Sequence, residues 1–244
     1  MATQVLSDAR IYVGEHDLSG DHSAVSLDYS AEMLDDTVFG DTTRSKKGGL
    51  KVVGLSGEGL WSGGADLVDD ALFSNIAVAD VPVTVVPGGE TLANACYLFR
   101  ANSGSYEFGG AVGEMLRFSV SAEGSGGTGL ARGELMHVGS ETATGTKAAK
   151  VNLGALTAAQ TMYAAVHVIS VSGTSPTLDV VVRSDANASA GGETTRIAFT
   201  QATAITSEWK SYAGAQTDAY WDIGWTIGGT GSPTFDFIVS VGIL

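Results

Sequence analysis

The histidines are the side chains best suited to acid–base or metal chemistry at neutral pH, and this chain has four: His16, His22, His137 and His167. No two lie four residues apart, and no HExxH sequence is present. His16 and His22 lie in acidic turns, which leaves a metal site open as a minor alternative. His167 lies in an apolar run, which favours a histidine of the core or of an interface over a catalytic base.

The nucleophiles and acids form no catalytic pattern either. There is no Gly-x-Ser-x-Gly sequence, and the glycine-rich stretches at 56–59 and 62–64 are not followed by the Lys-Ser/Thr of a phosphate loop. Scattered acids give no support for a glycosidase pair: Asp179, Asp185, Asp218 and Asp222. We therefore expect no enzymatic activity, no catalytic residue, no metal and no cofactor.

The single cysteine, Cys96, excludes an intrachain disulfide and a cysteine-based zinc site. It lies in the apolar run 95–99, which is typical of a small buried hydrophobic side chain. Residues 1–8 lack the basic and apolar parts of a signal peptide, and no apolar run approaches the roughly 18 residues of a membrane span. We expect a soluble protein made in a reducing cytoplasm, with no membrane partner.

Composition narrows the class of protein further. The chain has 244 residues and a net charge of −14, and only 16% of its residues are charged. Apolar residues make up 44% of the chain, and 33 glycines occur without a collagen repeat, so disorder and a fibrous fold are both excluded. The acidic balance opposes binding to nucleic acid, which needs cations to neutralise phosphates. An acidic surface would suit a protein that DNA must pass without sticking.

Charge is unevenly distributed along the chain. Residues 1–146 hold 20 acidic and 8 basic residues, whereas residues 147–244 hold 7 acidic and 5 basic ones. The polar, small-residue stretch 138–146 separates them and is typical of a linker. We predict two domains, 1–146 and 147–244.

Hydrophobic spacing predicts a mainly β fold. Expected strands lie at 9–14, 22–29, 50–61, 97–101, 115–122 and 130–138, and then at 161–171, 178–183, 196–201, 220–227 and 235–241. Apolar residues at helical spacing predict one helix over 65–77, capped by Ser62 or Gly64, with Asp66, Asp69 and Asp70 favoured near its start by the helix dipole. The first domain is expected to be a sandwich with this helix on its flank, and the second a sandwich or jelly roll.

Between the second and third strands, residues 30–49 show no clear periodicity and predict a long loop. Apolar residues in it are flanked by acids on one side and by bases on the other. The expected interface residues are Met33, Leu34, Asp35, Asp36, Val38, Phe39, Asp41, Arg44, Lys46 and Lys47. This pattern favours docking on another subunit, with a lid over the chain's own sheet as the alternative.

The same region carries a family resemblance. Thr37-Val38-Phe39-Gly40-Asp41-Thr42 and Arg44 are followed by Gly49-Leu50-Lys51 and the strand 52–59. Over roughly residues 8–138, this order resembles the major tail tube proteins of long-tailed bacteriophages. The resemblance implies a sandwich with a flanking helix, six-subunit rings stacked into a tube, and a long loop that contacts neighbouring subunits. It also implies that residues 147–244 form either an outer decoration or a second tube-type domain, the latter giving a pseudo-hexameric trimer.

The expected function is therefore a structural one in the virion. The chain would be made in the host bacterial cytoplasm, assemble with itself and other tail proteins, and form a conduit whose acidic lumen lets DNA slide through. A capsid decoration protein is one alternative. A carbohydrate-binding module is another, because the second domain is rich in aromatic residues. Trp209, Tyr212 and Tyr220 are the candidate surface rings, whereas Trp221 and Trp225 share a face with Ile223 and are expected to be buried.

Overall fold

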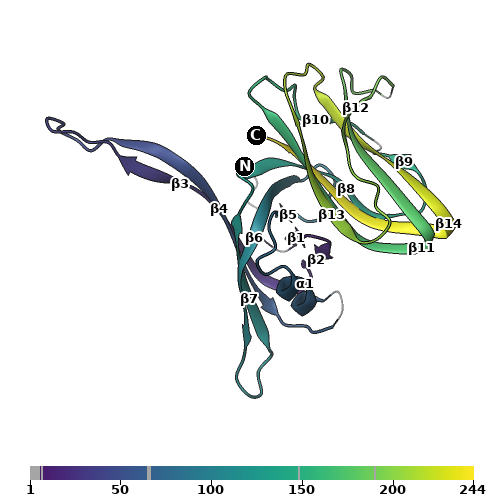
Figure 1. Cartoon of the computed structure of the whole chain (residues 1–244), viewed down its shortest axis with the longest axis horizontal. Coiled ribbons are helices and arrows are strands. Elements are labelled where there is room, and N and C mark those ends of the chain that lie inside the picture. Colours follow the sequence, from purple (N-terminus) through teal and green to yellow (C-terminus); the bar gives the residue numbers. More distant parts are fainter. Residues whose placement is uncertain (1–5, 7, 65–66, 148, 190) are drawn as a thin grey trace. The chain divides into compact units, whose positions relative to one another are not determined.

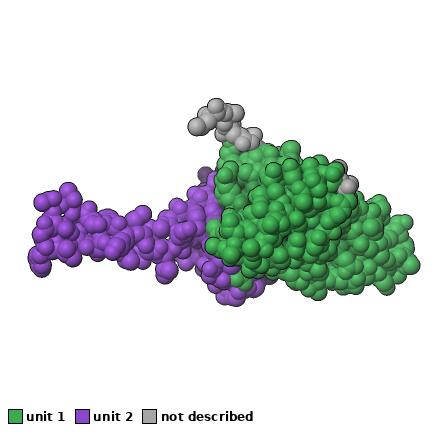
Figure 2. All heavy atoms as spheres, turned by 90° about the horizontal axis from the view of Figure 1, so that it is seen from above, with its two compact units in different colours: residues 1–20, 81–100, 131–244 green, residues 21–80, 101–130 purple. Residues whose placement is uncertain are grey.

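The structure is a computed structural model, which describes residues 6, 8–64, 67–147, 149–189 and 191–244. The chain is mainly β with one short helix, which confirms the expected fold class (Figure 1). It divides into two compact units, which are coloured separately in Figure 2. Unit 1 comprises residues 1–20, 81–100 and 131–244, and unit 2 comprises residues 21–80 and 101–130. Among the described residues no helix has the length and apolar character needed to span a membrane.

The strands alternate between the units along the chain. Unit 1 holds β1 (Arg10–Val13), β2 (His16–Asp17), β5 (Val81–Val86), β8 (Ala131–Glu141), β9 (Gly145–Thr146), β10 (Val151–Asn152), β11 (Thr161–Asp185), β12 (Thr194–Ala198), β13 (Thr206–Ala213) and β14 (Tyr220–Ile243). Unit 2 holds β3 (His22–Asp35), β4 (Lys46–Leu60), α1 (Val68–Ser74) and β7 (Arg117–Gly124). Strand β6 (Ala95–Gly109) contributes residues to both.

Unit 1 is organised by the pairing of β11 with β14. The antiparallel register runs from Met162 opposite Ile243 to Asp185 opposite Tyr220 and shifts around residues 172–177. Gly173 and Gly231 have positive φ angles in this region, a conformation that glycine adopts without a steric penalty. On either side of the irregularity, alternate side chains of both strands join a single buried core, so the long ribbon forms both layers of a sandwich.

A second core lies on the other face of this ribbon. It includes Tyr12 of β1, Val86 of β5, Ala165 of β11 and Ile238 of β14. The run 164–168 is consequently buried on both faces, as its continuous apolar character predicts.

The expected linker at 138–146 is instead part of unit 1. β8 pairs with β14 from Glu141 opposite Phe235 to Arg132 opposite Ile243, and β9 pairs with Gly224 and Trp225. Residues 131–146 therefore lie in one compact unit with 147–244, and unit 2 is inserted into unit 1 twice. The difference has a physical reason: the charge asymmetry reports surface composition, whereas the units are set by pairing between strands distant in sequence.

Unit 2 contains a four-stranded antiparallel sheet in the order β3–β4–β7–β6. Its inner face includes the buried Val53, Leu55, Phe118 and Ala122.

Helix α1 has a buried face of its own, formed by Val68, Ala71 and Leu72. The helix is shorter than expected and begins after Leu67, where no side chain caps it; Ser62 instead accepts a hydrogen bond from Asp69 N through its carbonyl oxygen. Residues 65 and 66, where the expected helix began, lie outside the described residues.

The segment 30–49 is mostly strand and not a long loop. β3 and β4 pair out to Asp35 opposite Lys46, and only residues 36–45 connect them. A register shift between Ala31 and Met33 interrupts the ladder, and most side chains here are exposed on both faces. With neither face buried, the sequence carries no alternation of apolar and polar residues, which explains why periodicity missed the hairpin.

Truncation after Gly145 tests the observed division of the chain. The truncated chain loses β11 and β14 and with them both cores of unit 1, so we expect loss of cooperative unfolding and of near-ultraviolet circular dichroism. A chain that retained a cooperative thermal transition with native ellipticity per residue would instead support an independent 1–146 domain.

Candidate assembly interface

The tip of the β3–β4 hairpin presents apolar side chains to solvent. Phe39 is fully exposed, Val38 is 68% exposed and Met33 is 61% exposed, and Leu34 is also exposed. Exposed side chains of this size, so close together, are typical of a protein–protein contact. They do not cover a sheet of their own unit, which argues against a lid.

The backbone of the tip is nevertheless held in place. Asp41 accepts a hydrogen bond from Val38 N at 3.0 Å and donates its own N–H to Val38 O at 3.2 Å. Asp36 N donates to Ser45 O at 3.1 Å, and the Asp36 carboxylate pairs with Lys47 at 3.0 Å. The hydrogen bond from Lys47 lowers the pKa of Asp36. The tip is thus an organised turn that displays Phe39.

Some of the charged residues on the hairpin have interaction partners on the hairpin itself. Asp35 accepts a hydrogen bond from Thr37, which lowers the pKa of Asp35, and Lys51 lies over the Tyr29 ring at 5.7 Å. Arg44 and Lys46 are exposed at and beside the tip. The structure therefore brings together the apolar and charged residues that the sequence nominated on this hairpin.

Sequence reasoning missed several exposed apolar residues of unit 2. Leu50 and Val52 are 80% and 51% exposed on β4, and Val112 is fully exposed at the tip that joins β6 to β7. Phe73 is 74% exposed on α1. The sequence around each of these residues resembles that of a buried strand or helix position. Their exposure is therefore visible only in the structure, where no other element covers them.

The middle of the outer face of the unit 2 sheet is acidic and lined with small side chains. Register aligns three rows across β3, β4, β7 and β6: Ala24, Glu58, Ser119 and Glu107; Ser26, Ser56, Ser121 and Ser105; Asp28, Gly54, Glu123 and Asn102. All twelve positions are exposed or half-buried. None is basic or a large apolar residue, so four carboxylates stand on this face without a cation among the rows.

The expected surface aromatics of unit 1 are engaged in packing. Trp209 stacks on Tyr163 with ring centroids 5.4 Å apart, and the Tyr212 ring lies 5.6 Å from the Arg196 guanidinium. Tyr220 is half-buried.

Trp221 and Trp225 are buried, as predicted, and their indole N–H groups donate to Gly154 O and Ala143 O. These aromatic residues form no continuous exposed platform for a sugar ring.

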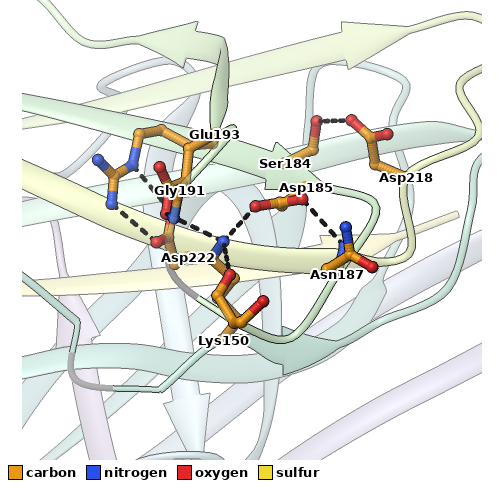
Figure 3. Close-up of polar contacts among 10 residues, drawn as sticks. Lys150, Ser184, Asp185, Asn187, Gly191, Glu193, Asp218 and Asp222 are labelled. Carbon is orange, nitrogen blue, oxygen red and sulfur yellow. Dashed lines mark hydrogen bonds and ion pairs between the residues drawn. The ribbon is translucent and has the colours of Figure 1, made fainter.

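The scattered acids of the second half converge at the end of β11 (Figure 3). Asp222 receives two hydrogen bonds from Arg183, at 2.9 and 2.7 Å, and Asp218 pairs with Arg196 at 3.1 Å. Lys150 joins Asp185 and also Glu193, the latter at 2.9 Å.

The environment of Glu193 shows what the cluster does. Its carboxylate accepts hydrogen bonds from Gly191 N and Lys150, and these lower its pKa to about 2. Each of these carboxylates is matched to a cation, and Asp185, Asp218 and Glu193 accept further hydrogen bonds, which is typical of a structural ion-pair cluster. Asp179 lies apart and accepts a hydrogen bond from Gln201. No group of three or more metal-ligating side chains occurs in the part of the chain that the structure describes.

A cavity of about 200 Å³ opens in unit 1 between β11 and the segment from Phe199 to Glu208. Its walls are mostly apolar, and the Glu208 carboxylate at its rim accepts hydrogen bonds from Thr200 N and Oγ1 at 2.7 and 2.9 Å. That carboxylate is committed to the loop it holds, so the cavity offers no free acid or base.

Two histidines are buried in unit 1. His167 Nδ1 donates a hydrogen bond to Gly14 O at 2.6 Å, and Nε2 of the neutral ring accepts one from the Thr84 hydroxyl at 2.9 Å. His137 stacks on Phe237 with centroids 4.2 Å apart. Burial lowers the pKa of each to about 4. The expectation that His167 belongs to the core is confirmed.

Comparison with known proteins gives only distant likenesses. No protein-family model and no curated protein matches the chain. A chain from the virion of a native gene transfer agent particle aligns at 15% identity, covering 53% of this chain and 98% of that one, with a TM-score of 0.42. A chain from the sheath–tube complex of an extracellular contractile injection system aligns at 12% identity. The alignment covers 55% of this chain and 92% of that one, with a TM-score of 0.43.

The Dit protein of phage SPP1, described as a paradigm of the hub adsorption apparatus, aligns along almost the whole chain. It covers 98% of this chain and 100% of its own, at 12% identity and a TM-score of 0.39. These likenesses are too distant to assign the chain to a family.

The buried histidines predict acid sensitivity. Each has a folded pKa near 4, below the ordinary value of 6.5, so the unfolded chain takes up protons first as the pH falls. The free energy of unfolding is greatest above pH 6.5 and declines toward pH 4. By pH 5 we expect each histidine to have lowered it by about 2 kcal/mol. Denaturant unfolding at pH 7, 6 and 5 measures this.

The variant His137→Phe is the matched comparison, because it keeps an aromatic ring against Phe237 while removing one titrating group. It should lose about half of the pH dependence. An unchanged dependence would place the acid-sensitive groups elsewhere.

Proposed function

We propose that this protein is a structural subunit of a phage-type tail tube, assembling through unit 2 into stacked rings around a channel for DNA. The observation that carries the proposal is the sheet of unit 2. One face of it is buried, whereas the middle of the other is exposed, acidic and lined with small side chains, with Val52, Leu60 and Arg117 in the rows beyond. The resemblance of residues 37–59 to tail tube sequences supports the same role.

The exposed face suits the wall of a DNA channel. Phosphates are repelled by Asp28, Glu58, Glu107 and Glu123, and no Lys or Arg lies within the three rows to bind them. Small serine side chains keep the wall smooth. Unit 2 has 14 acidic and five basic residues and so carries −9 of the net charge of −14.

The edge of this sheet favours self-association. Strand β3 pairs with β4 alone among the described strands, so its outer N–H and C=O groups have no strand partner there. An exposed edge is a template for pairing with another chain, and a closed ring removes it. We propose six copies per ring; a trimeric ring is the alternative.

Unit 1 is proposed to serve as a decoration of the tube. Its sandwich has its own cores, and its net charge is smaller. Because the aromatic rings of unit 1 are engaged in packing, a carbohydrate-binding role has no observation in its favour.

The hairpin tip provides the test of assembly. We expect the double variant Val38→Asp/Phe39→Asp to fold as the parent does, because both side chains are exposed, and to remain monomeric where the parent forms rings or tubes. Negative-stain electron microscopy and light scattering at matched concentration measure this. The control is Ile205→Asp, at a 43% exposed apolar position in unit 1, which should still assemble. Tubes formed by the double variant would contradict the role of the tip.

The channel wall has its own test. The triple variant Glu58→Lys/Glu107→Lys/Glu123→Lys should bind a double-stranded DNA fragment at low salt and release it as salt rises, because the wall now attracts phosphates. A gel shift measures this on assembled protein. The charge-matched control is Glu15→Lys/Glu141→Lys/Asp179→Lys in unit 1. This control should bind less than one tenth as much DNA in the channel as the triple variant of the sheet face binds. Equal binding by both variants would show that this face is not the wall.

A further inference from the structure

The cavity in unit 1 is lined by both arms of β11, the one before and the one after the irregularity at residues 172–177. Its apolar lining also includes two residues from the segment that follows β12. The six apolar residues are Val166, Val168, Leu178, Val180, Phe199 and Ala202. Each is at most 7% exposed and belongs to the core of the sandwich, so the cavity reaches into that core.

A row of polar side chains on β13 explains why the sandwich is hollow at this place. Alternate residues of β13 stand opposite core residues of β11, and they are Thr206, Glu208, Lys210 and Tyr212. The three longer side chains each bond to a residue between Arg196 and Thr200, on β12 or just after it. Thr206 ends the row and has its shortest side chain, and the cavity opens beside it.

The backbone around the cavity is fixed by hydrogen bonds. Leu178 and Ala202 exchange two backbone hydrogen bonds, at 2.8 and 2.9 Å, and Phe199 N donates to Val180 O at 3.0 Å. On the other side, the antiparallel pairing of β13 with β11 holds the polar row in register. The cavity is therefore preformed, and a ligand would bind without the cost of ordering the chain around it.

The volume of the cavity sets the size of its occupant. A cavity of about 150 Å³ lined by apolar side chains accommodates benzene, whereas drug-sized ligands need pockets of about 300 Å³ or more. At about 200 Å³, this cavity has room for one six-membered ring with a small substituent. Phe199 in the lining is a packing partner for an aromatic ring.

The rim of the cavity sets the polarity of the occupant. The Glu208 carboxylate lies 3.2 Å from Lys210 Nζ, so each of these charges already has an ion partner. Gln201 Nε2 donates to Asp179 at 2.9 Å, which leaves the Gln201 carbonyl oxygen as an acceptor, and the Thr206 hydroxyl is a second one. A charged ligand would lose hydration here without gaining a free ion partner, whereas an O–H group meets an acceptor.

We propose that the cavity in unit 1 binds a small, uncharged aromatic molecule that carries a hydroxyl group, a ligand of the phenol class. The ring packs against Phe199 and the aliphatic lining, and the hydroxyl group donates a hydrogen bond at the rim. This inference does not depend on the proposed assembly, because every residue that lines the cavity belongs to unit 1.

Titration of the full chain with 4-fluorophenol, followed by fluorine NMR, tests the site. We expect saturable binding to the parent protein. Thr206→Leu fills the cavity and removes the rim hydroxyl, and it should weaken binding by about tenfold or more. The matched control is Thr206→Ser, which keeps both the space and the hydroxyl and should bind within about twofold of the parent.

A second ligand tests the polarity of the site. The probe 4-fluorobenzoate has a ring of the same size but is charged at neutral pH. It should bind about tenfold more weakly than 4-fluorophenol, because its carboxylate is desolvated beside the Glu208 carboxylate. Equal affinity for the two probes would overturn the assignment to uncharged ligands.

Methyl-labelled parent protein locates the bound probe without any substitution. Chemical-shift changes caused by 4-fluorophenol should be largest at the methyl groups of Val168, Leu178 and Val180, and small at Val53 and Leu55 of unit 2. This pattern, with binding lost in Thr206→Leu and kept in Thr206→Ser, supports the site. The proposal is overturned if the parent shows no saturable binding, if the changes are largest elsewhere, or if folded Thr206→Leu binds as the parent does.

Discussion

Unit 2 has, in its described residues, one sheet and a single seven-residue helix, which is too small to cover both faces of the sheet. One face must therefore remain in contact with water, and this constraint shapes the unit. The inner face buries Val53, Leu55 and Phe118, whereas the outer face stays in water. Serine, glycine and carboxylate side chains satisfy that requirement without inviting a second layer. The same shortage of covering elements leaves β3 as an open edge among the described strands and Phe73 exposed. The features proposed for assembly all follow from what this unit does not cover.

Unit 1 meets the opposite condition. Its long β11–β14 ribbon supplies both layers of one sandwich core and one wall of a second core, so nearly every apolar residue finds a partner. Several polar groups in its interior are matched as well: Thr84 bonds both His167 and Ser240, and Lys150 bonds two carboxylates and the carbonyl of Ser189. A unit so internally satisfied offers little apolar surface for association. This contrast is why we place assembly in unit 2.

The sequence predicts the structure correctly where burial of one face produces a periodic pattern of apolar residues, and it fails where no face is buried. The alternation around Trp221 and Trp225 predicts their shared buried face correctly, because packing selects every second residue. The strands at 161–171 and 178–183 are one strand, since Gly173 permits an irregularity without ending the pairing. The hairpin beyond Ser30 has no covered face, so nothing distinguishes its strands from a loop. The polar stretch at 138–146 has a linker's composition, yet its pairing partners lie about 80 to 100 residues away.

The acidic face illustrates the same limit at the level of function. Ser26, Ser56, Ser121 and Ser105 belong to four strands that are neighbours only in the order β3–β4–β7–β6, and no local window of sequence reveals the row. Net charge alone indicates that acids are in excess, not where they gather. The tip is different, because its apolar residues and charges are contiguous and need no fold to be noticed. Local contiguity made the tip predictable, and non-local register hid the rows that we propose as the channel wall.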